Sequence, residues 1–141
     1  MNEQLAGALA AEEAASYAYG LIGVRLTGDG ARDEARAAEA AHRARRDVLV
    51  SRLAQLKAST APAPAGYELP FEVTDKASAL KLAIHVEDGV AAAWRATLPV
   101  TTGGDRATSL AALTDAAVRA TRWRRLAEVT PVTVPFPGRP A

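Results

Sequence analysis

The stretch that decides the fold reads Ala38-Glu39-Ala40-Ala41-His42-Arg43-Ala44-Arg45-Arg46. It lies in a long alanine-rich segment and places a carboxylate and an imidazole three residues apart. At about 100° per residue, this spacing predicts that Glu39 and His42 share one face of a helix, roughly one turn apart. A Glu-x-x-His pair that faces the interior of a helical bundle is half of a carboxylate-bridged di-metal site. The other half would have to come from residues elsewhere in the chain.

The composition favours closely packed helices. Of the 141 residues, 49% are hydrophobic but only 5% are aromatic, so the apolar content is mostly alanine, leucine and valine. A β-sheet would need more β-branched and aromatic residues. The length predicts one domain, residues 1–141, that is large enough to bury a core.

Charge and cysteine content exclude several classes of function. The formal net charge of +1 gives no basis for binding nucleic acid or an anionic membrane surface. The absence of cysteine excludes disulfides, thiolate metal sites and cysteine nucleophiles. No apolar run approaches the ~20 residues of a membrane span, and the first residues do not form a secretion signal. We therefore expect a cytoplasmic protein.

Apolar residues recur at spacings of three and four in four segments, which predicts four amphipathic helices. These helices are expected at about residues 2–26, 31–57, 76–98 and 106–128. Because the turn between the first two is short, they should be antiparallel.

A long connector, residues 58–74, separates the second and third helices and contains three prolines. In extended form it could span about 50 Å, whereas a 25-residue helix is only about 38 Å long. The connector can therefore return the chain along the whole bundle, so that the second and third helices run in the same direction. The proline-rich tail, residues 129–141, is expected to lie extended along the surface.

Each expected helix carries an acidic residue near its middle. Glu12 lies on the apolar stripe of the first helix, where it either reaches solvent at the edge of the stripe or faces the interior. Glu87 occupies the middle of the clearest stripe, on the third helix. In the fourth helix the only central acid is Asp115, and three residues later the sequence has Val118 instead of a histidine.

Several short motifs are more specific than the helical pattern. They are Tyr19-Gly20, the run His42-Arg43-Ala44-Arg45-Arg46, Trp123 and the ending Phe136-Pro137-Gly138. Together with the four helices and their central acids, they resemble the ferritin-like superfamily, and in particular the ferritin-like domains of unknown function found in actinobacterial proteins. The resemblance covers nearly the whole chain. It implies an all-α fold, a ferritin-like four-helix bundle with a long crossover between the second and third helices, and it implies no particular reaction.

Proteins of that superfamily bind two iron or manganese ions. Their ligands are a glutamate on the first helix, Glu-x-x-His on the second, a glutamate on the third and Glu-x-x-His on the fourth. The resemblance therefore implies that Glu12, Glu39 and His42 bind a first metal, with Glu87 as the glutamate of the third helix.

The fourth helix departs from this pattern. Asp115 is shorter than glutamate, and Val118 cannot bind a metal. A second metal would lack its imidazole, and oxygen activation in this superfamily rests on two adjacent metals.

The first functional hypothesis is a bundle without a catalytic metal or another cofactor. Arg46 falls on the same line of the second helix as Glu39, two turns later, so Arg46 and His42 could neutralise the buried acids. The protein would then have no catalytic residues and would be a structural or interaction module. It would form a homodimer through an alanine-rich helix face.

The second hypothesis is a metal-dependent oxidase or a metal carrier. One metal would bind at Glu12, Glu39 and His42, with Glu87 as a further ligand. This oxygen and nitrogen ligand set suits iron, manganese or zinc. Val118 and the orientation of Arg46 separate the two hypotheses. An inward Arg46 argues against a metal, whereas an outward Arg46 reopens the metal site.

A third hypothesis assigns an anionic partner to the basic residues of the second and fourth helices. Such runs on helices are usually solvated faces, and this hypothesis ranks below the other two. These residues are Arg43, Arg45, Arg46, Arg119, Arg122, Arg124 and Arg125.

Overall fold

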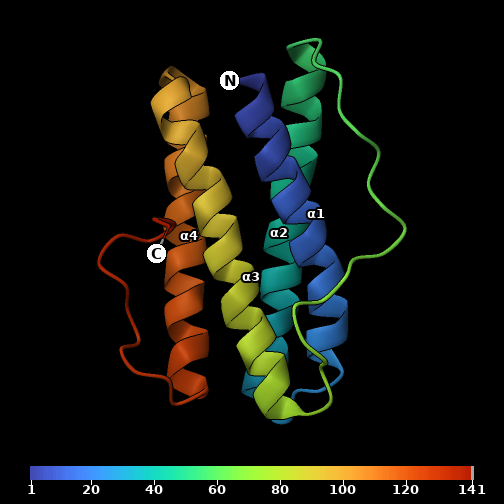
Figure 1. The fold of residues 1–141 in the computed structure, drawn as a ribbon, viewed down its shortest axis with the longest axis vertical. Coiled ribbons are helices and arrows are strands. Elements are labelled where there is room, and N and C mark those ends of the chain that lie inside the picture. Colours follow the sequence, from blue (N-terminus) through green and yellow to red (C-terminus); the bar gives the residue numbers. More distant parts are fainter. Residues whose placement is uncertain (141) are drawn as a thin grey trace.

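Four long α-helices lie side by side in the protein, a computed structural model of which describes residues 1–140 (Figure 1). No β-strand occurs in that range. The elements are α1 (Asn2–Gly23), α2 (Asp29–Gln55), α3 (Lys76–Thr97), the 3-10 turn η1 (Leu98–Val100) and α4 (Gly103–Leu126). The four helices expected from the apolar spacing are therefore present, with ends that differ by at most three residues.

The chain crosses the length of the bundle between α2 and α3. α1 and α2 are antiparallel, and residues 56–75 then return along the outside of the bundle, so that α3 starts at the end where α2 started (Figure 1). α2 and α3 consequently run in the same direction, as the length of the connector predicts. The rings of Tyr67 and Tyr17, 5.2 Å apart, join this crossover to α1.

A capping box sets the start of α3. The side chain of Asp75 accepts a hydrogen bond from the backbone N–H of Ser78 at 2.8 Å, and the Ser78 hydroxyl accepts one from the backbone N–H of Asp75 at 3.1 Å. Two donors that have no partner within the helix are thereby satisfied. This cap ends the crossover and fixes the register of α3, and therefore the position of Glu87.

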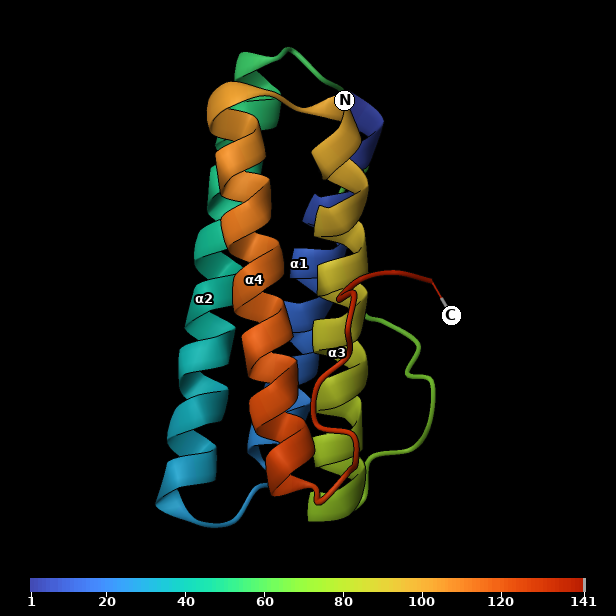
Figure 2. The ribbon, with the colours of Figure 1, turned by 90° about the vertical axis from the view of Figure 1, so that its left-hand side faces the viewer.

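The tail packs along α3 and α4 (Figure 2). Arg95 on α3 donates a hydrogen bond to the carbonyl oxygen of Pro137 at 3.2 Å. Gly138 has a φ of +77°, and a Cβ atom at this position would lie 2.5 Å from the carbonyl oxygen of Ala91. Only glycine allows the tail this close to α3. Residues 129–140 therefore follow the surface as a series of bends and turns, while residue 141 lies outside the described range.

The buried apolar side chains form two clusters, one toward each end of the bundle. Alanines fill much of both clusters and let the helices approach closely. The largest members of the first cluster are Leu5, Leu9, Leu49, Leu53, Trp94 and Leu113. The largest members of the second are Tyr19, Ile22, Leu26, Leu80, Leu82 and Trp123.

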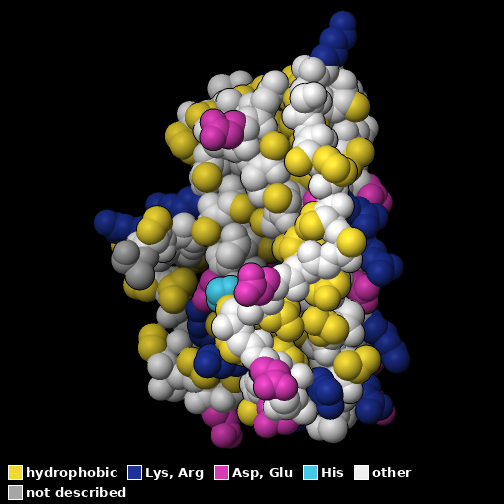
Figure 3. Space-filling view, turned by 45° about the vertical axis from the view of Figure 1, so that its right-hand side comes forward, with side chains coloured by type: hydrophobic (Ala, Val, Ile, Leu, Met, Phe, Trp, Pro, Cys, Tyr) yellow, Lys and Arg dark blue, Asp and Glu magenta, His cyan; other side chains and the backbone are white. Residues whose placement is uncertain are grey.

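On the face that includes the crossover, many Lys and Arg side chains lie along one edge and a second group lies on the opposite side. Hydrophobic side chains are spread over the middle of this face (Figure 3). Within the described part of the chain, no helix is long and apolar enough to span a bilayer.

Candidate functional site

A layer of polar side chains separates the two apolar clusters at mid-height. We call it the central polar layer and define it by its five residues, which come from all four helices and are all buried. They are Glu12 and Tyr19 on α1, His42 on α2, Glu87 on α3 and Arg119 on α4. Burying charged groups is costly unless they are paired and hydrogen-bonded, so the contacts within this layer decide what it can do.

His42 joins the two glutamates of the layer. Its Nδ1 lies 2.5 Å from Oε2 of Glu12, and its Nε2 lies 2.8 Å from Oε1 of Glu87. Carboxylates only accept hydrogen bonds, so both ring nitrogens donate when the imidazole carries its second proton. The imidazole of His42 thus bridges α1 and α3 as a cation between two carboxylates.

Aromatic side chains supply further hydrogen bonds to the same carboxylates. The indole N–H of Trp94 donates to Oε1 of Glu12 at 2.6 Å, and the hydroxyl of Tyr19 donates to Oε1 of Glu87 at 2.6 Å. The indole N–H of Trp123 donates in turn to the hydroxyl oxygen of Tyr19 at 2.8 Å. Both oxygens of Glu12 are therefore engaged, and the indoles connect the polar layer to the two apolar clusters.

Arg119 is the contribution of α4. Its Nη1 lies 3.5 Å from Oε1 of Glu87, and its Nη2 donates to Oδ2 of Asp115 at 2.9 Å. Two buried atoms, Nη1 of Arg119 and Oε2 of Glu87, have no hydrogen-bond partner. One is a donor and the other an acceptor, so this corner is the least satisfied part of the layer.

The charges of the layer shift the pKa of His42 upward. Burial by itself lowers that pKa, but the hydrogen bonds and charges of Glu12 and Glu87 outweigh burial and raise it from 6.5 to about 9. Burial, and then the charge of Glu87, raise the pKa of Tyr19 well above its usual value of 10. At neutral pH, His42 is therefore a cation and Tyr19 a neutral hydrogen-bond donor.

Three of the five candidate ligands meet in this layer, namely Glu12, His42 and Glu87, and the other two do not. Glu39 lies on the surface of α2, where its carboxylate accepts a hydrogen bond from Arg43 at 2.7 Å. Asp115 lies at the edge of α4 and pairs with Arg119 and, at 3.5 Å, with Arg45.

The expected neutralisation by Arg46 is wrong. Arg46 points to the surface and pairs with Asp47 at 2.9 Å. Arg119 takes that role from a different helix. A signal for Arg119 was present in the sequence, because it lies between the buried residues Ala116 and Trp123 at helical spacing. The spacing alone does not reveal this, because an arginine four residues after Asp115 can equally form a surface pair with it.

The arrangement of donors does not match a metal centre. A metal needs lone pairs that converge on one point, whereas the lone pairs of Glu12 and Glu87 are directed at the two nitrogens of His42. Among residues 1–140, no group of three or more His, Asp or Glu side chains has the geometry to hold a metal ion. Arg119 adds a further positive charge beside Glu87. The layer is arranged as a hydrogen-bonded chain.

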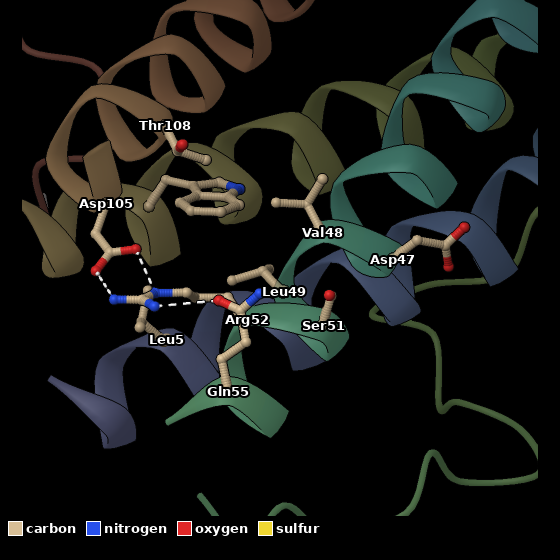
Figure 4. Close-up of a pocket in the computed structure, with 10 residues that line it drawn as sticks. Leu5, Asp47, Val48, Leu49, Ser51, Arg52, Gln55, Asp105 and Thr108 are labelled. Atoms are coloured by element: carbon tan, nitrogen blue, oxygen red, sulfur yellow. Dashed lines mark hydrogen bonds and ion pairs between the residues drawn. The ribbon is translucent and has the colours of Figure 1, made fainter. Parts of the chain in front are cut away.

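A surface cavity lies at the seam between α2 and α4. It has a volume of about 490 Å³ and contains Val48, Thr108 and the ion pair between Arg52 and Asp105, whose two hydrogen bonds measure 2.8 and 2.9 Å (Figure 4). Trp94 also lines this cavity while its N–H faces Glu12. The indole therefore stands between the cavity and the central polar layer, which stays closed to solvent.

Comparisons with known proteins give a fold and a family. Residues 4–141 match the model of a family described as a domain of unknown function, DUF4439. The crystal structure of a conserved hypothetical protein from Mycobacterium tuberculosis is similar, with a TM-score of 0.84 and 39% sequence identity over 89% of this chain and 95% of that one. No protein with a curated description matches. The similarity extends over nearly the whole bundle, and neither description names an activity.

Proposed function

The chain belongs to the DUF4439 family, and we propose that it is a structural or interaction module whose buried charges neutralise one another without a metal. The position of His42 carries this proposal. With one carboxylate on each ring nitrogen, at 2.5 and 2.8 Å, the imidazole has no lone pair free for a metal. The long crossover and the central acids support a ferritin-like fold as part of the same proposal.

Charge balance supports the proposal as well. Glu12 and Glu87 bring two negative charges into the core, and His42 and Arg119 bring two positive charges. The four groups come from four different helices, so each pairing fixes one helix against another. A buried polar network of this kind can specify which helices pack together, at the expense of some stability.

The interaction surface we propose is the outward face of α4. Leu110, Thr114 and Val118 follow one another at spacings of four, so they form one exposed line along the helix. Leu110 is 55% exposed and Val118 45% exposed. A second copy of the chain is the partner we propose, because an uncharged line on a straight helix can pack against itself.

Sedimentation equilibrium tests this dimer. Leu110→Arg with Val118→Arg should convert a dimer into a monomer, while Val24→Arg, at a residue 78% exposed elsewhere, should leave the mass unchanged. A wild-type protein that is monomeric at all concentrations would contradict the dimer without affecting the proposal for the core.

A second candidate function is metal binding by Glu12, His42 and Glu87. The observation that favours it is Oε2 of Glu87, which is buried and has no partner. The metal would have to displace a proton from His42 and turn the ring away from one carboxylate. Iron or manganese would suit these ligands.

Metal analysis of the purified protein separates the two candidates. After incubation with ferrous iron or Mn²⁺ and removal of free metal, our first proposal predicts far less than one metal ion per chain. One ion per chain that is lost in His42→Ala and kept in Glu39→Ala would instead establish the second candidate. Circular dichroism of both variants checks that they remain folded.

A further inference from the structure

A groove at the end of the bundle where α3 begins has apolar and basic residues that play no part in the proposed function. It lies where α3 begins and α4 ends, and it has a volume of about 700 Å³. This value falls within the range of about 300–1,000 Å³ that is usual for sites of small molecules. Its lining includes Leu80, Ile84, Leu126 and Val129.

Exposed apolar side chains lie next to one another in the lining of the groove. Leu126 is 46% exposed and Val129 is 43% exposed. They lie on the last turn of α4 and just after it, and Ile84 of α3 lines the same groove. Neighbouring exposed apolar residues in a concave site indicate a contact with an apolar ligand.

The charged residues that line the groove are two lysines. Lys76 and Lys81 both belong to the first turns of α3, and both are exposed. In the described part of the chain, no carboxylate lies within ion-pair distance of either lysine. The ammonium group of Lys81 lies 4.6 Å from the centre of the Phe71 ring, which holds it beside the groove. The groove therefore joins apolar walls to an uncompensated positive charge.

We propose that this groove binds a single-chain carboxylate amphiphile, with its hydrocarbon chain against Leu126 and Val129 and its carboxylate at Lys76 and Lys81. The apolar walls account for the chain, and the two lysines account for the anionic group by charge complementarity. A hydrocarbon chain gains free energy with each methylene group that it buries, so a medium-length chain suffices for a measurable affinity.

Calorimetric titration with dodecanoate below its micelle concentration tests the proposal. We expect one dodecanoate per chain. Dodecyltrimethylammonium has the same chain with the opposite charge, and acetate has the same head group without the chain, so both should bind at least about tenfold more weakly. Equal binding of dodecanoate and dodecyltrimethylammonium would overturn the proposal.

Matched variants locate the site. The double variant Lys76→Glu with Lys81→Glu should weaken dodecanoate binding at least about tenfold, whereas Lys57→Glu, at the other end of the bundle, should not. A glutamate at the first residue of α3 stabilises the helix. Unfolding would therefore not explain a loss of dodecanoate binding in this variant.

The apolar wall has its own pair of variants. Val129→Gln should weaken binding, whereas Val50→Gln, at a residue that is 50% exposed on α2, should not. Unchanged affinity in both the double lysine variant and Val129→Gln would contradict the proposal. Tighter binding to phosphatidylglycerol vesicles than to monomeric dodecanoate would also contradict it, because the lysines would then serve a membrane surface.

Discussion

Two charged groups of α2, three residues apart, have pairs of opposite kinds: one pair is on the surface within α2, and the other reaches buried carboxylates of α1 and α3. Glu39 pairs with Arg43 at 2.7 Å on the surface of α2, and the Arg43 side chain is 59% exposed. His42, between these two residues in sequence, pairs with Glu12 and Glu87 in the core and is almost completely buried. Glu39 and Arg43 can each replace the other by water, whereas the buried His42, Glu12 and Glu87 have no access to water.

The difference in burial predicts how much each charged pair contributes to the stability of the bundle. Exposed pairs between helix neighbours contribute little to stability because water and salt screen them. The buried groups of the central polar layer have protein groups as partners in place of water, so removal of one charged group leaves its partners uncompensated. If the layer is self-neutralised, substitutions in it should be far more damaging than substitutions in the surface pair.

The largest expected effect is that of Glu87→Ala. This change removes the partner of His42, Tyr19 and Arg119 at once, and the cost should be about 3–5 kcal/mol in the free energy of unfolding. Urea denaturation followed by circular dichroism measures it. Glu87→Gln retains an acceptor for the Tyr19 hydroxyl and should cost less than Glu87→Ala. A loss below about 1 kcal/mol for Glu87→Ala would be incompatible with a tightly coupled layer.

The next effect is a dependence of stability on pH. The pKa of His42 is about 9 in the folded chain against 6.5 for an unperturbed histidine. A raised folded pKa gives a stabilisation that is complete below pH 6.5 and is lost as the pH rises through 9. Over that window the free energy of unfolding should fall by roughly 3 kcal/mol.

Urea denaturation at a series of pH values measures this fall. The chain has two histidines, so His85→Gln is the matched control and should leave the fall unchanged. Should the fall disappear in His85→Gln, it would belong to the exposed histidine and not to the core.

Trp94→Phe should have an intermediate effect. It keeps most of the ring in its cluster but removes the N–H that donates to Glu12 at 2.6 Å, at a cost of about 1–3 kcal/mol. Thermal unfolding measures this cost, and thermal unfolding of Trp123→Phe tests the hydrogen bond to Tyr19 in the same way. An unchanged melting temperature in Trp94→Phe would show that the stability of the layer does not depend on the hydrogen bond to Glu12.

The smallest effect should come from Glu39→Ala. It removes only the exposed pair with Arg43, and the free energy of unfolding should change by less than about 0.5 kcal/mol. A loss comparable with that of Glu87→Ala would place Glu39 in the core after all.

Periodicity predicted the four helices and placed His42 and Glu87 on their inner faces, where both are buried. The stripe of α3 predicted that Glu87 faces the interior, and Glu87 is buried. The stripe of α1 contained Glu12 but left open whether it faces solvent or the interior, and in the structure it is buried. In α2 the inner line could advance by three or by four residues at each turn, and alanine occupies many of the alternatives. The buried line passes through Ala38 and not Glu39, and Arg45, not Arg46, faces α4.

Sequence reasoning could not determine how the layer is neutralised. Arg119 lies on an apolar line of α4, but an arginine there has the same spacing whether it reaches back to Asp115 or inward to Glu87. It does both, which only the relative rotation of α3 and α4 reveals. The pairing of both nitrogens of His42 likewise depends on three helices at once.

The most direct test of a self-neutralised core is a ¹⁵N NMR titration of the imidazole of His42. The account predicts that both ring nitrogens carry a proton at pH 7, that the ring titrates near pH 9, and that its signals do not change when Zn²⁺ or Mn²⁺ is added. A neutral ring at pH 7 whose signals shift or broaden with stoichiometric metal would contradict the account.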